Sequence, residues 1–273
     1  MDLKLTDEEK IIQSTVARFV ETELLPAELV FLKQKEPFPP LGDPPMRELE
    51  PGLKTTLTEK AKKSGIWYLN LPEELGGPGF NRMARVIADR EFGKTAVPFE
   101  LPEFPSFLPG GPLMKRIADE DRSISPALGG IHKTGKETEI CTAYRKAPGG
   151  YCLNGSNIDV LRPNCDLFLI PACKENSRAV GLFLVDRNGQ GVVVSDHAEM
   201  TADCEFARLR LTECKISEER LVGNEDNLRQ LIAAERLRLA ARSLGMGDRC
   251  LSASLQHARN RVTFGQPLSS RQA

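Results

Sequence analysis

Among the acidic residues of this 273-residue chain, Glu235 has the sequence surroundings that acid–base chemistry requires. It stands among apolar neighbours on an amphipathic stretch, with Ile232 three residues before it and Leu239 four residues after it. Residues at these spacings share one face of a helix, so we expect both side chains to exclude water from the carboxylate. A desolvated carboxylate is a stronger base, which makes Glu235 a candidate general base. A surface or salt-bridged helical glutamate is the alternative interpretation.

A second set of residues that could bind a ligand lies at the end of the sequence, in RNRVTFGQPLSSRQ. Arg261 could bind a phosphate group, because a guanidinium offers a fixed fork of N–H donors. Phe264 could form an apolar wall beside a ring. The alternative is an arginine at the end of a helix followed by a phenylalanine of the core.

Composition excludes several classes of protein. The chain has 37 basic and 38 acidic residues, a balance that does not indicate binding to nucleic acid or to an anionic membrane surface. Apolar runs such as 167–172 are too short to span a bilayer, and the start, MDLKLTDEEK, lacks signal character. Seven cysteines without a C-x-x-C pair favour reduced thiols in the cytoplasm over disulfides or zinc, and three histidines without an H-x-x-x-H pair argue against a metal centre.

The first part of the chain, residues 1–120, has helical periodicity. Thr6 and Glu9 predict a capping box, and Pro26 should end the first helix or lie near its end. We expect further helices over 53–64, closed by Gly65, and over 82–92. The proline-rich stretches 36–51 and 98–112 predict irregular chain.

The second part, residues 121–222, has the period of strands. Short β-branched and apolar runs such as AVGLFLVD alternate with Gly, Asn and Asp turns, and nothing of helical length separates them. We therefore expect an antiparallel sheet or barrel.

The third part, residues 223–273, begins with one long helix from about Asp226. Two apolar stripes run along this helix, and little chain follows that could cover them. Such a surface predicts an oligomer, either homomeric or with an unlike partner. The fold class is α+β: a helical domain, a β-domain and the first part of a C-terminal helical domain, which we expect to be truncated.

This order and three motifs resemble the acyl-CoA dehydrogenase family. LPEELGGPGF resembles the family's P-E-x-x-G-G-x-G, and GGYCLNGSNIDVLRPNCDLFLIPAC is similar to the strand pair around its Y-x-L-N-G-x-K. The ending RNRVTFGQPLSSRQ resembles its R-x-x-F-G-x-P signature with a later glutamine, the most specific of the three. The resemblance covers essentially the whole chain and implies helical, β and four-helix domains with FAD between the last two.

The resemblance also implies an activity and site residues. Family members remove the α-proton of an acyl-CoA thioester while a β-hydride passes to FAD, and they deliver electrons to electron-transfer flavoprotein. Some place the base in an E-R pair on the first helix of the C-terminal domain, which Glu235 and Arg236 match, Arg236 as a substrate-binding residue. The signature residues that contact FAD held mainly by a neighbouring subunit correspond to Arg261, Thr263, Phe264 and Gln272.

The middle domain departs from the family pattern. Where the family has T-E-P-x-x-G-S-D, this chain has Ile124, Gly130 and Ile131 in place of the Thr, Ser and Asp; where the family has W-I-T, it has Asp159, Val160 and Leu161. We therefore expect the isolated chain to carry less than one FAD per chain. Three readings stay open: a dehydrogenase using Glu235, a partner subunit to a chain that holds the flavin, and an interaction protein without cofactor.

Overall fold

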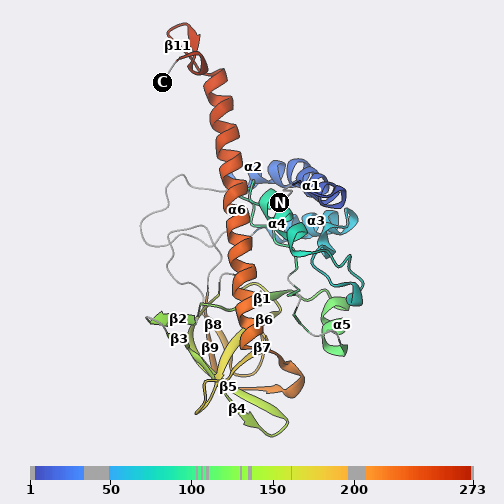
Figure 1. Cartoon of the computed structure of the whole chain (residues 1–273), viewed down its shortest axis with the longest axis vertical. Helices are drawn as coiled ribbons and strands as arrows, with labels where there is room; N and C mark the ends of the chain where they lie inside the picture. Colours follow the sequence, from blue (N-terminus) through green and yellow to red (C-terminus); the bar gives the residue numbers. More distant parts are fainter. Residues whose placement is uncertain are drawn as a thin grey trace.

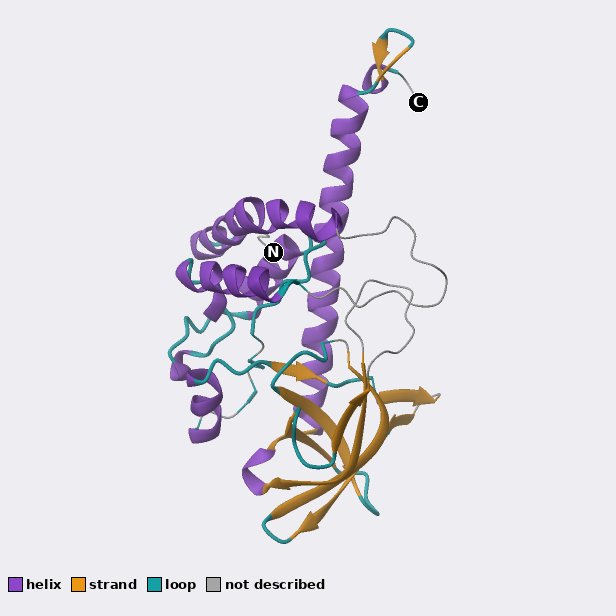
Figure 2. Ribbon diagram, turned by 180° about the vertical axis from the view of Figure 1, so that it is seen from behind, coloured by secondary structure: helices purple, strands orange, loops and turns teal. Residues whose placement is uncertain are grey.

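The computed structural model describes residues 4–33, 49–102, 104–105, 107–108, 111–129, 131–134, 137–160, 162–195 and 207–271. A group of helices and a β-domain lie on one side and at one end of a long helix, α6, which runs past both (Figures 1 and 2). The order of helical domain, β-domain and long helix is the one predicted. Of the residues expected to face a ligand, Gly130, Leu161 and Gln272 lie outside the described residues.

The first helical run is longer than predicted. α1 (Asp7–Phe19) begins at the predicted capping box, in which Thr6 and Glu9 bond each other's backbone N–H, and a π-helical turn (Val20–Leu24) leads into α2 (Leu25–Lys33). The prediction that Pro26 ends the first helical run or lies near its end is wrong, because the run continues to Lys33. Proline has no backbone N–H to donate within a helix. The π-helical turn shifts the hydrogen-bond pattern just before Pro26, so that this residue stands in the first turn of α2, where an N–H is not needed.

The remaining helices of this domain follow the sequence more closely. α3 (Pro51–Lys63) starts two residues before the predicted helix, and Gly65 closes it with φ +77°, in the left-handed region that favours glycine. α4 (Arg82–Phe92) has the predicted bounds, and its cap is Asn81. A short helix, α5 (Pro112–Asp119), follows the proline-rich stretch.

In the part of the chain that the structure describes, eight strands form one sheet. Its order is β10-β7-β6-β4-β5-β9-β8, with β1 added beside β6. The strands are β1 (Ile124–Pro126), β4 (Thr142–Ala147), β5 (Gly150–Val160), β6 (Leu167–Lys174), β7 (Val180–Asp186), β8 (Val192–Ser195), β9 (Ala207–Ser217) and β10 (Leu221–Asn224). The hairpin β2 (Ile131–Thr134) and β3 (Glu137–Ile140) stands apart from it.

The sheet is mixed, which corrects the prediction of an antiparallel one. β1 and β4 both run parallel to β6. The sequence runs did not reveal this, because β4 turns directly into β5 while its other edge meets a strand two positions later in the chain.

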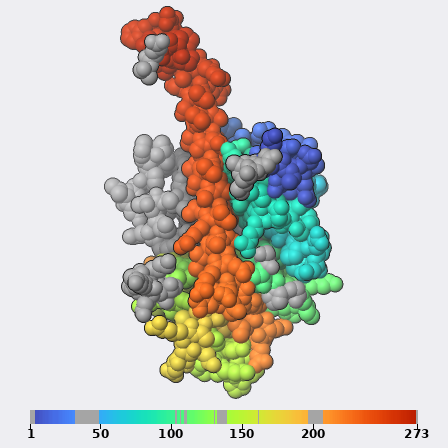
Figure 3. All heavy atoms as spheres, in the orientation of Figure 1, coloured from blue at the N-terminus to red at the C-terminus, as the bar shows by residue number. Residues whose placement is uncertain are grey.

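α6 (Glu225–Asn260) starts at a capping box of Asn224 and Asn227 and connects the domains. Its first turns pack Leu228 and Leu231 into a core shared with α5, β1, β6 and β7. Its middle packs against α4, and its end carries a small hairpin, β11 (Val262–Thr263) and β12 (Gln266–Pro267). This end projects beyond the helical domain (Figure 3).

Two negative findings apply to the described residues. Within them, no group of three His, Cys, Asp or Glu side chains could hold a metal ion. No helix among them is long and apolar enough to cross a membrane. The six cysteines that the structure describes are free thiols.

Candidate functional site

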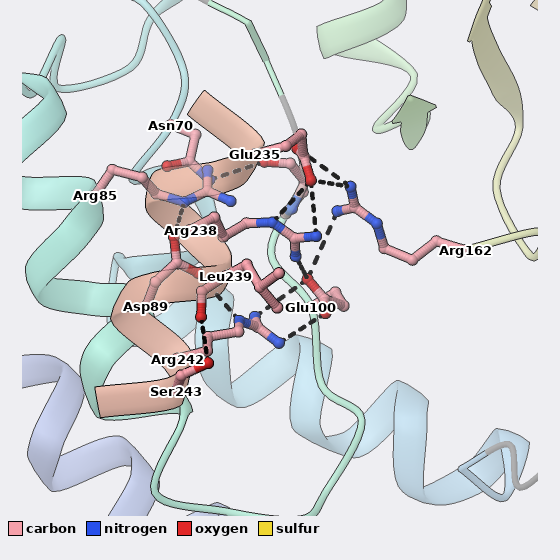
Figure 4. A network of polar contacts seen from close by, with 11 residues as sticks. Asn70, Arg85, Asp89, Glu100, Arg162, Glu235, Arg238, Leu239, Arg242 and Ser243 are labelled. Carbon is pink, nitrogen blue, oxygen red and sulfur yellow. Dashed lines mark hydrogen bonds and ion pairs between the residues drawn. The ribbon is translucent and has the colours of Figure 1, made fainter. Parts of the chain in front are cut away.

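Glu235 lies in the third turn of α6, where the helix passes between the helical domain and the β-domain. Its side chain is 21% exposed. The carboxylate accepts hydrogen bonds from Nη2 and Nε of Arg238, one turn further along α6, at 2.9 and 3.2 Å. Arg162, which follows β5, approaches it from the β-domain with Nη2 3.5 Å from both oxygens (Figure 4).

A second carboxylate continues this set of ion pairs. Glu100, from the segment after α4, accepts from Arg238 at 3.1 Å and from Arg242 at 2.8 Å. Arg242 also reaches the buried Asp89 of α4 at 3.3 Å. Arg85 completes the set at 2.7 Å from Asp89. We call these residues the arginine–carboxylate network: Arg85, Asp89, Glu100, Arg162, Glu235, Arg238 and Arg242.

The network connects the helical domain, the β-domain and α6. Its named members are four arginines and three carboxylates. Ion pairs that are largely out of water hold their geometry, because removal of either partner leaves an uncompensated charge. Glu235 is thus oriented by its neighbours and is not a freely rotating surface acid.

The predicted environment of Glu235 is wrong. Leu239, expected to shield the carboxylate, is 69% exposed, and Ile232 only packs at the edge of the shared core. The face of α6 that meets the other domains carries Glu235, Arg238 and Arg242, at spacings of three and four residues, so Leu239 points outward. The carboxylate lies among guanidinium groups and not in an apolar pocket.

A cavity of about 490 Å³ adjoins the network, between the helical domain and the β-domain. Glu100 and Arg162 belong both to the network and to the cavity wall, whereas Glu235 is not part of the wall. Apolar lining comes from side chains such as Trp67 and Phe99. Arg162 and Glu100 therefore separate the cavity from Glu235, and a ligand in the cavity would meet them first.

The residues of the C-terminal motif form a separate site. Phe264 lies at the tip of the β11–β12 hairpin, is 96% exposed and has φ +51°. The guanidinium of Arg271 lies 5.1 Å from the centre of its ring. Arg261 is exposed at the end of α6, and the hydroxyl of Thr263 is buried without a partner among the described residues. Since α6 rises ~1.5 Å per residue, the hairpin is roughly 40 Å from Glu235.

Comparison with known proteins decides the family. The chain matches the acyl-CoA dehydrogenase N-terminal domain over residues 6–115 and the acyl-CoA dehydrogenase C-terminal domain over residues 226–273. The chain belongs to the acyl-CoA dehydrogenase family.

Individual relatives share the whole length of this chain. It is 24% identical to the caffeyl-CoA reductase-Etf complex subunit CarC of Acetobacterium woodii, over 98% of this chain and 73% of that protein. It is 25% identical to benzylmalonyl-CoA dehydrogenase of Aromatoleum aromaticum, over 100% of this chain and 74% of that protein. The ChsE4-ChsE5 complex from Mycobacterium tuberculosis is similar in structure, with a TM-score of 0.78 and 25% identity, over 99% of this chain and 71% of that chain.

In this chain, the described residues of the middle domain do not fit FAD. Asp159, where the family has an aromatic residue, is paired with Arg208 at 3.2 Å. Ile124 is buried in the shared core and offers no hydroxyl. The N–H of Gly129 donates to the carbonyl of Asp159 at 3.0 Å, so this loop lies directly on the ion-paired residue. An ion pair and an isoleucine thus stand where a flavin would need a ring and hydroxyl donors.

Sequence reasoning found one member of the network and missed six. Arg236, predicted to bind substrate, is exposed and takes no part in the network. The signal for Arg238 and Arg242 was available, because they follow Glu235 by three and seven residues and therefore share its face. Glu100 and Arg162 had no such signal, because the fold alone brings them to α6.

Proposed function

We propose that this chain is a subunit of an FAD-dependent acyl-CoA dehydrogenase and that it supplies Glu235 as the base that takes the α-proton of an acyl-CoA thioester. The observation that carries the proposal is the oriented, largely buried carboxylate on α6 at the junction of the three domains, behind the wall of a cavity. A positioned carboxylate is the group that proton abstraction beside a thioester carbonyl requires.

The same geometry says how this chain would use Glu235. Both guanidinium groups hold the carboxylate in place, and Arg162 must move aside before a thioester in the cavity can reach it. Arg238, on the same helix and at the shorter distance, can keep its contact and orient the carboxylate while the proton is taken.

We further propose that the FAD of the assembly is held mainly by another chain. The Asp159–Arg208 pair and the buried Ile124 support this, because they leave the β-domain without the groups that face a flavin. The exposed hairpin would add Arg261, Thr263 and Phe264, with Gln272 beyond it, to a flavin site on a neighbouring chain. An exposed phenylalanine stacked by an arginine offers an apolar face and a fixed cation for such a contact.

The partners proposed follow from the relatives. One relative is a subunit of a complex with Etf, and a structural neighbour is the ChsE4-ChsE5 complex. We propose an assembly with an unlike dehydrogenase subunit or with a second copy, an electron-transfer flavoprotein as electron acceptor, and the cytoplasm as its location.

A second candidate function is a non-catalytic partner subunit on the same fold. The position of Glu235 between Arg162 and Arg238 favours it, because an ion-paired carboxylate also serves to fasten domains together. In that case the base, like the flavin, belongs to the partner chain.

The substitution Glu235→Gln distinguishes the two candidates. In the assembled complex, with its partner chain present, we expect anaerobic bleaching of the flavin by an acyl-CoA to slow by about two to four orders of magnitude. The control is Glu59→Gln, which changes an exposed glutamate of α3 and should leave the rate unchanged. An unchanged rate in Glu235→Gln would assign the base to the partner. Absorbance of the isolated chain at the flavin bands checks its cofactor content, which we expect to be below one FAD per chain.

A further inference from the structure

The cavity beside the network combines an apolar and a polar wall. Trp67, Phe99 and Leu101 contribute apolar surface, whereas Ser125 and Arg162 contribute hydrogen-bond donors. We call it the junction cavity. Charged side chains such as Lys54, Asp166 and Arg187 also line it, so the cavity offers apolar surface together with many polar groups. A small-molecule site needs both, apolar surface for the body of the ligand and placed polar groups to orient it.

Ser125 gives the first sign of a ligand. The residue is 2% exposed, lies in the wall of the junction cavity, and its hydroxyl has no hydrogen-bond partner among the described residues. A buried hydroxyl without a partner costs about 1–3 kcal/mol, so such groups are normally satisfied by water or by a ligand. Its oxygen is closed off from the cavity in this structure, so the hydroxyl would donate a hydrogen bond to an acceptor placed there only after its side chain rotates.

Arg162 gives the second sign. It lies 3.5 Å from the Glu235 carboxylate and 3.7 Å from that of Glu100. Both carboxylates have a nearer arginine, Arg238 at 2.9 Å and Arg242 at 2.8 Å. Because each carboxylate keeps this nearer arginine, an added anion could take Arg162 without leaving Glu235 or Glu100 unpaired.

The acidic groups in the wall are already occupied. Asp121 accepts from the indole N–H of Trp67 at 2.8 Å and pairs with Lys62. Asp166 accepts from the backbone N–H and the hydroxyl of Ser123 at 2.8 and 2.7 Å. They therefore repel an incoming anion less than free carboxylates would.

The wall next to Arg162 is buried at Cys165, which is 8% exposed. Burial raises the pKa of the Cys165 thiol to about 12, although the nearby Arg187 acts in the opposite direction. An ion pair in such surroundings is stronger than one at the surface, because little water screens it.

We propose that the junction cavity binds an organic carboxylate with an apolar body. Arg162 and Ser125 recognise the carboxylate, and binding draws Arg162 away from Glu235, which then keeps Arg238 as its guanidinium partner. The carboxylate comes either from a free acid or from the second carboxyl group of an acyl-CoA. The second source rests on the proposed function and deepens it, because it names the substrate class and makes Arg162 its specificity-determining residue.

The single tryptophan of the chain reports on the cavity directly, because Trp67 lies in its wall. We expect hexanoate to change the Trp67 emission of the full chain saturably and to bind about tenfold or more tightly than the uncharged hexanamide. Arg162→Gln should abolish this preference, and Ser125→Ala should weaken hexanoate binding several-fold. The control Arg229→Gln, at an exposed position near the start of α6, should bind as wild type does.

Two further measurements test the rest of the proposal. Glu235→Gln should bind hexanoate several-fold more tightly, because Arg162 no longer has a charged partner there. Glutaryl-CoA binding about tenfold more tightly than pentanoyl-CoA, through Arg162, would assign the site to the acyl group; equal binding of the two, with hexanoate still bound, would assign it to a free acid.

The proposal is overturned if hexanoate gives no saturable change, or if wild type and Arg162→Gln prefer hexanoate over hexanamide equally. Should Arg162→Gln unfold, as circular dichroism would reveal, Arg162→Lys keeps the charge without the fork and should bind hexanoate more weakly than wild type. Unchanged affinity in Glu235→Gln would overturn the coupling to Glu235. None of these measurements requires turnover or bound flavin, so a failure here is distinct from a failure of the proposed function.

Discussion

α6 carries two stripes of side chains, and the one that packs within the chain has more charged residues than the one that is exposed. The inner stripe meets the other domains and is rich in charge: Leu228, Leu231, Glu235, Arg238, Arg242, Gly245 and Arg249. The outer stripe is apolar and exposed: Leu237, Leu244, Leu251 and Leu255. Beyond the first turns of α6, the larger apolar side chains therefore do not mark the face that packs within the chain. The inner face depends on Leu228 and Leu231 at the start of the helix and, further along, on ion pairs and on close backbone contact.

The largest difference in the free energy of unfolding should come from replacing one leucine by alanine on each stripe. Leu231 is buried in the shared core, so Leu231→Ala should lower the free energy of unfolding by about 2–5 kcal/mol. Leu251 is exposed, and Leu251→Ala should change the free energy of unfolding by less than about 0.5 kcal/mol. Urea denaturation of the full chain at low concentration measures both.

The same pair of variants also tests the association predicted from the sequence. A loss at Leu251 that grows with protein concentration, together with a smaller species in sedimentation, would show that the outer stripe is buried between chains. A loss as large as that of Leu231→Ala at every concentration would contradict the distinction between the two stripes.

Local signals predicted the elements well where one short stretch decides the structure. The capping box of Thr6 and Glu9, the left-handed Gly65 and the bounds of α4 are each set by neighbours in sequence. Pro26 failed because the turn before it is π-helical, and the parallel pairs of the sheet failed because they join strands distant in the chain.

The candidate site was predictable only in part. The family resemblance pointed to Glu235, but the apolar neighbours chosen to shield it belong in part to the outer face. Its actual partner Arg162 lies 73 residues away in sequence. Glu100 meets Arg238 across 138 residues. Ion pairs of this kind depend on domain packing, which no local periodicity encodes.

The next contrast concerns two glycines of α6. Gly245 lies against α4, where an added Cβ would stand 1.9 Å from the carbonyl oxygen of Arg90, whereas nothing lies within 4 Å of such an atom at Gly247. Gly245→Ala should therefore cost about 1–3 kcal/mol of stability, because two backbones must separate. Gly247→Ala should gain up to about 1 kcal/mol, because alanine is the better helix former. Equal signs for the two changes in urea denaturation would contradict the close crossing of α4 and α6.

The smallest contrast compares two arginines of α6. Arg242 pairs with Asp89 and Glu100, and Arg242→Gln leaves the buried Asp89 with Arg85 as its remaining arginine within the network. We expect a loss of about 1–2 kcal/mol, reduced from the value of a fully buried pair because a quarter of the Arg242 side chain is exposed to screening. Arg236→Gln, on the exposed side of the same helix, should stay within about 0.5 kcal/mol of wild type. Unfolding at low and at molar salt separates the causes, because screening weakens an exposed ion pair and leaves a buried one nearly intact. A difference between the variants that vanishes in salt would show that the inner stripe is held by surface electrostatics, and one that persists would show that the network itself fastens α6 to the helical domain.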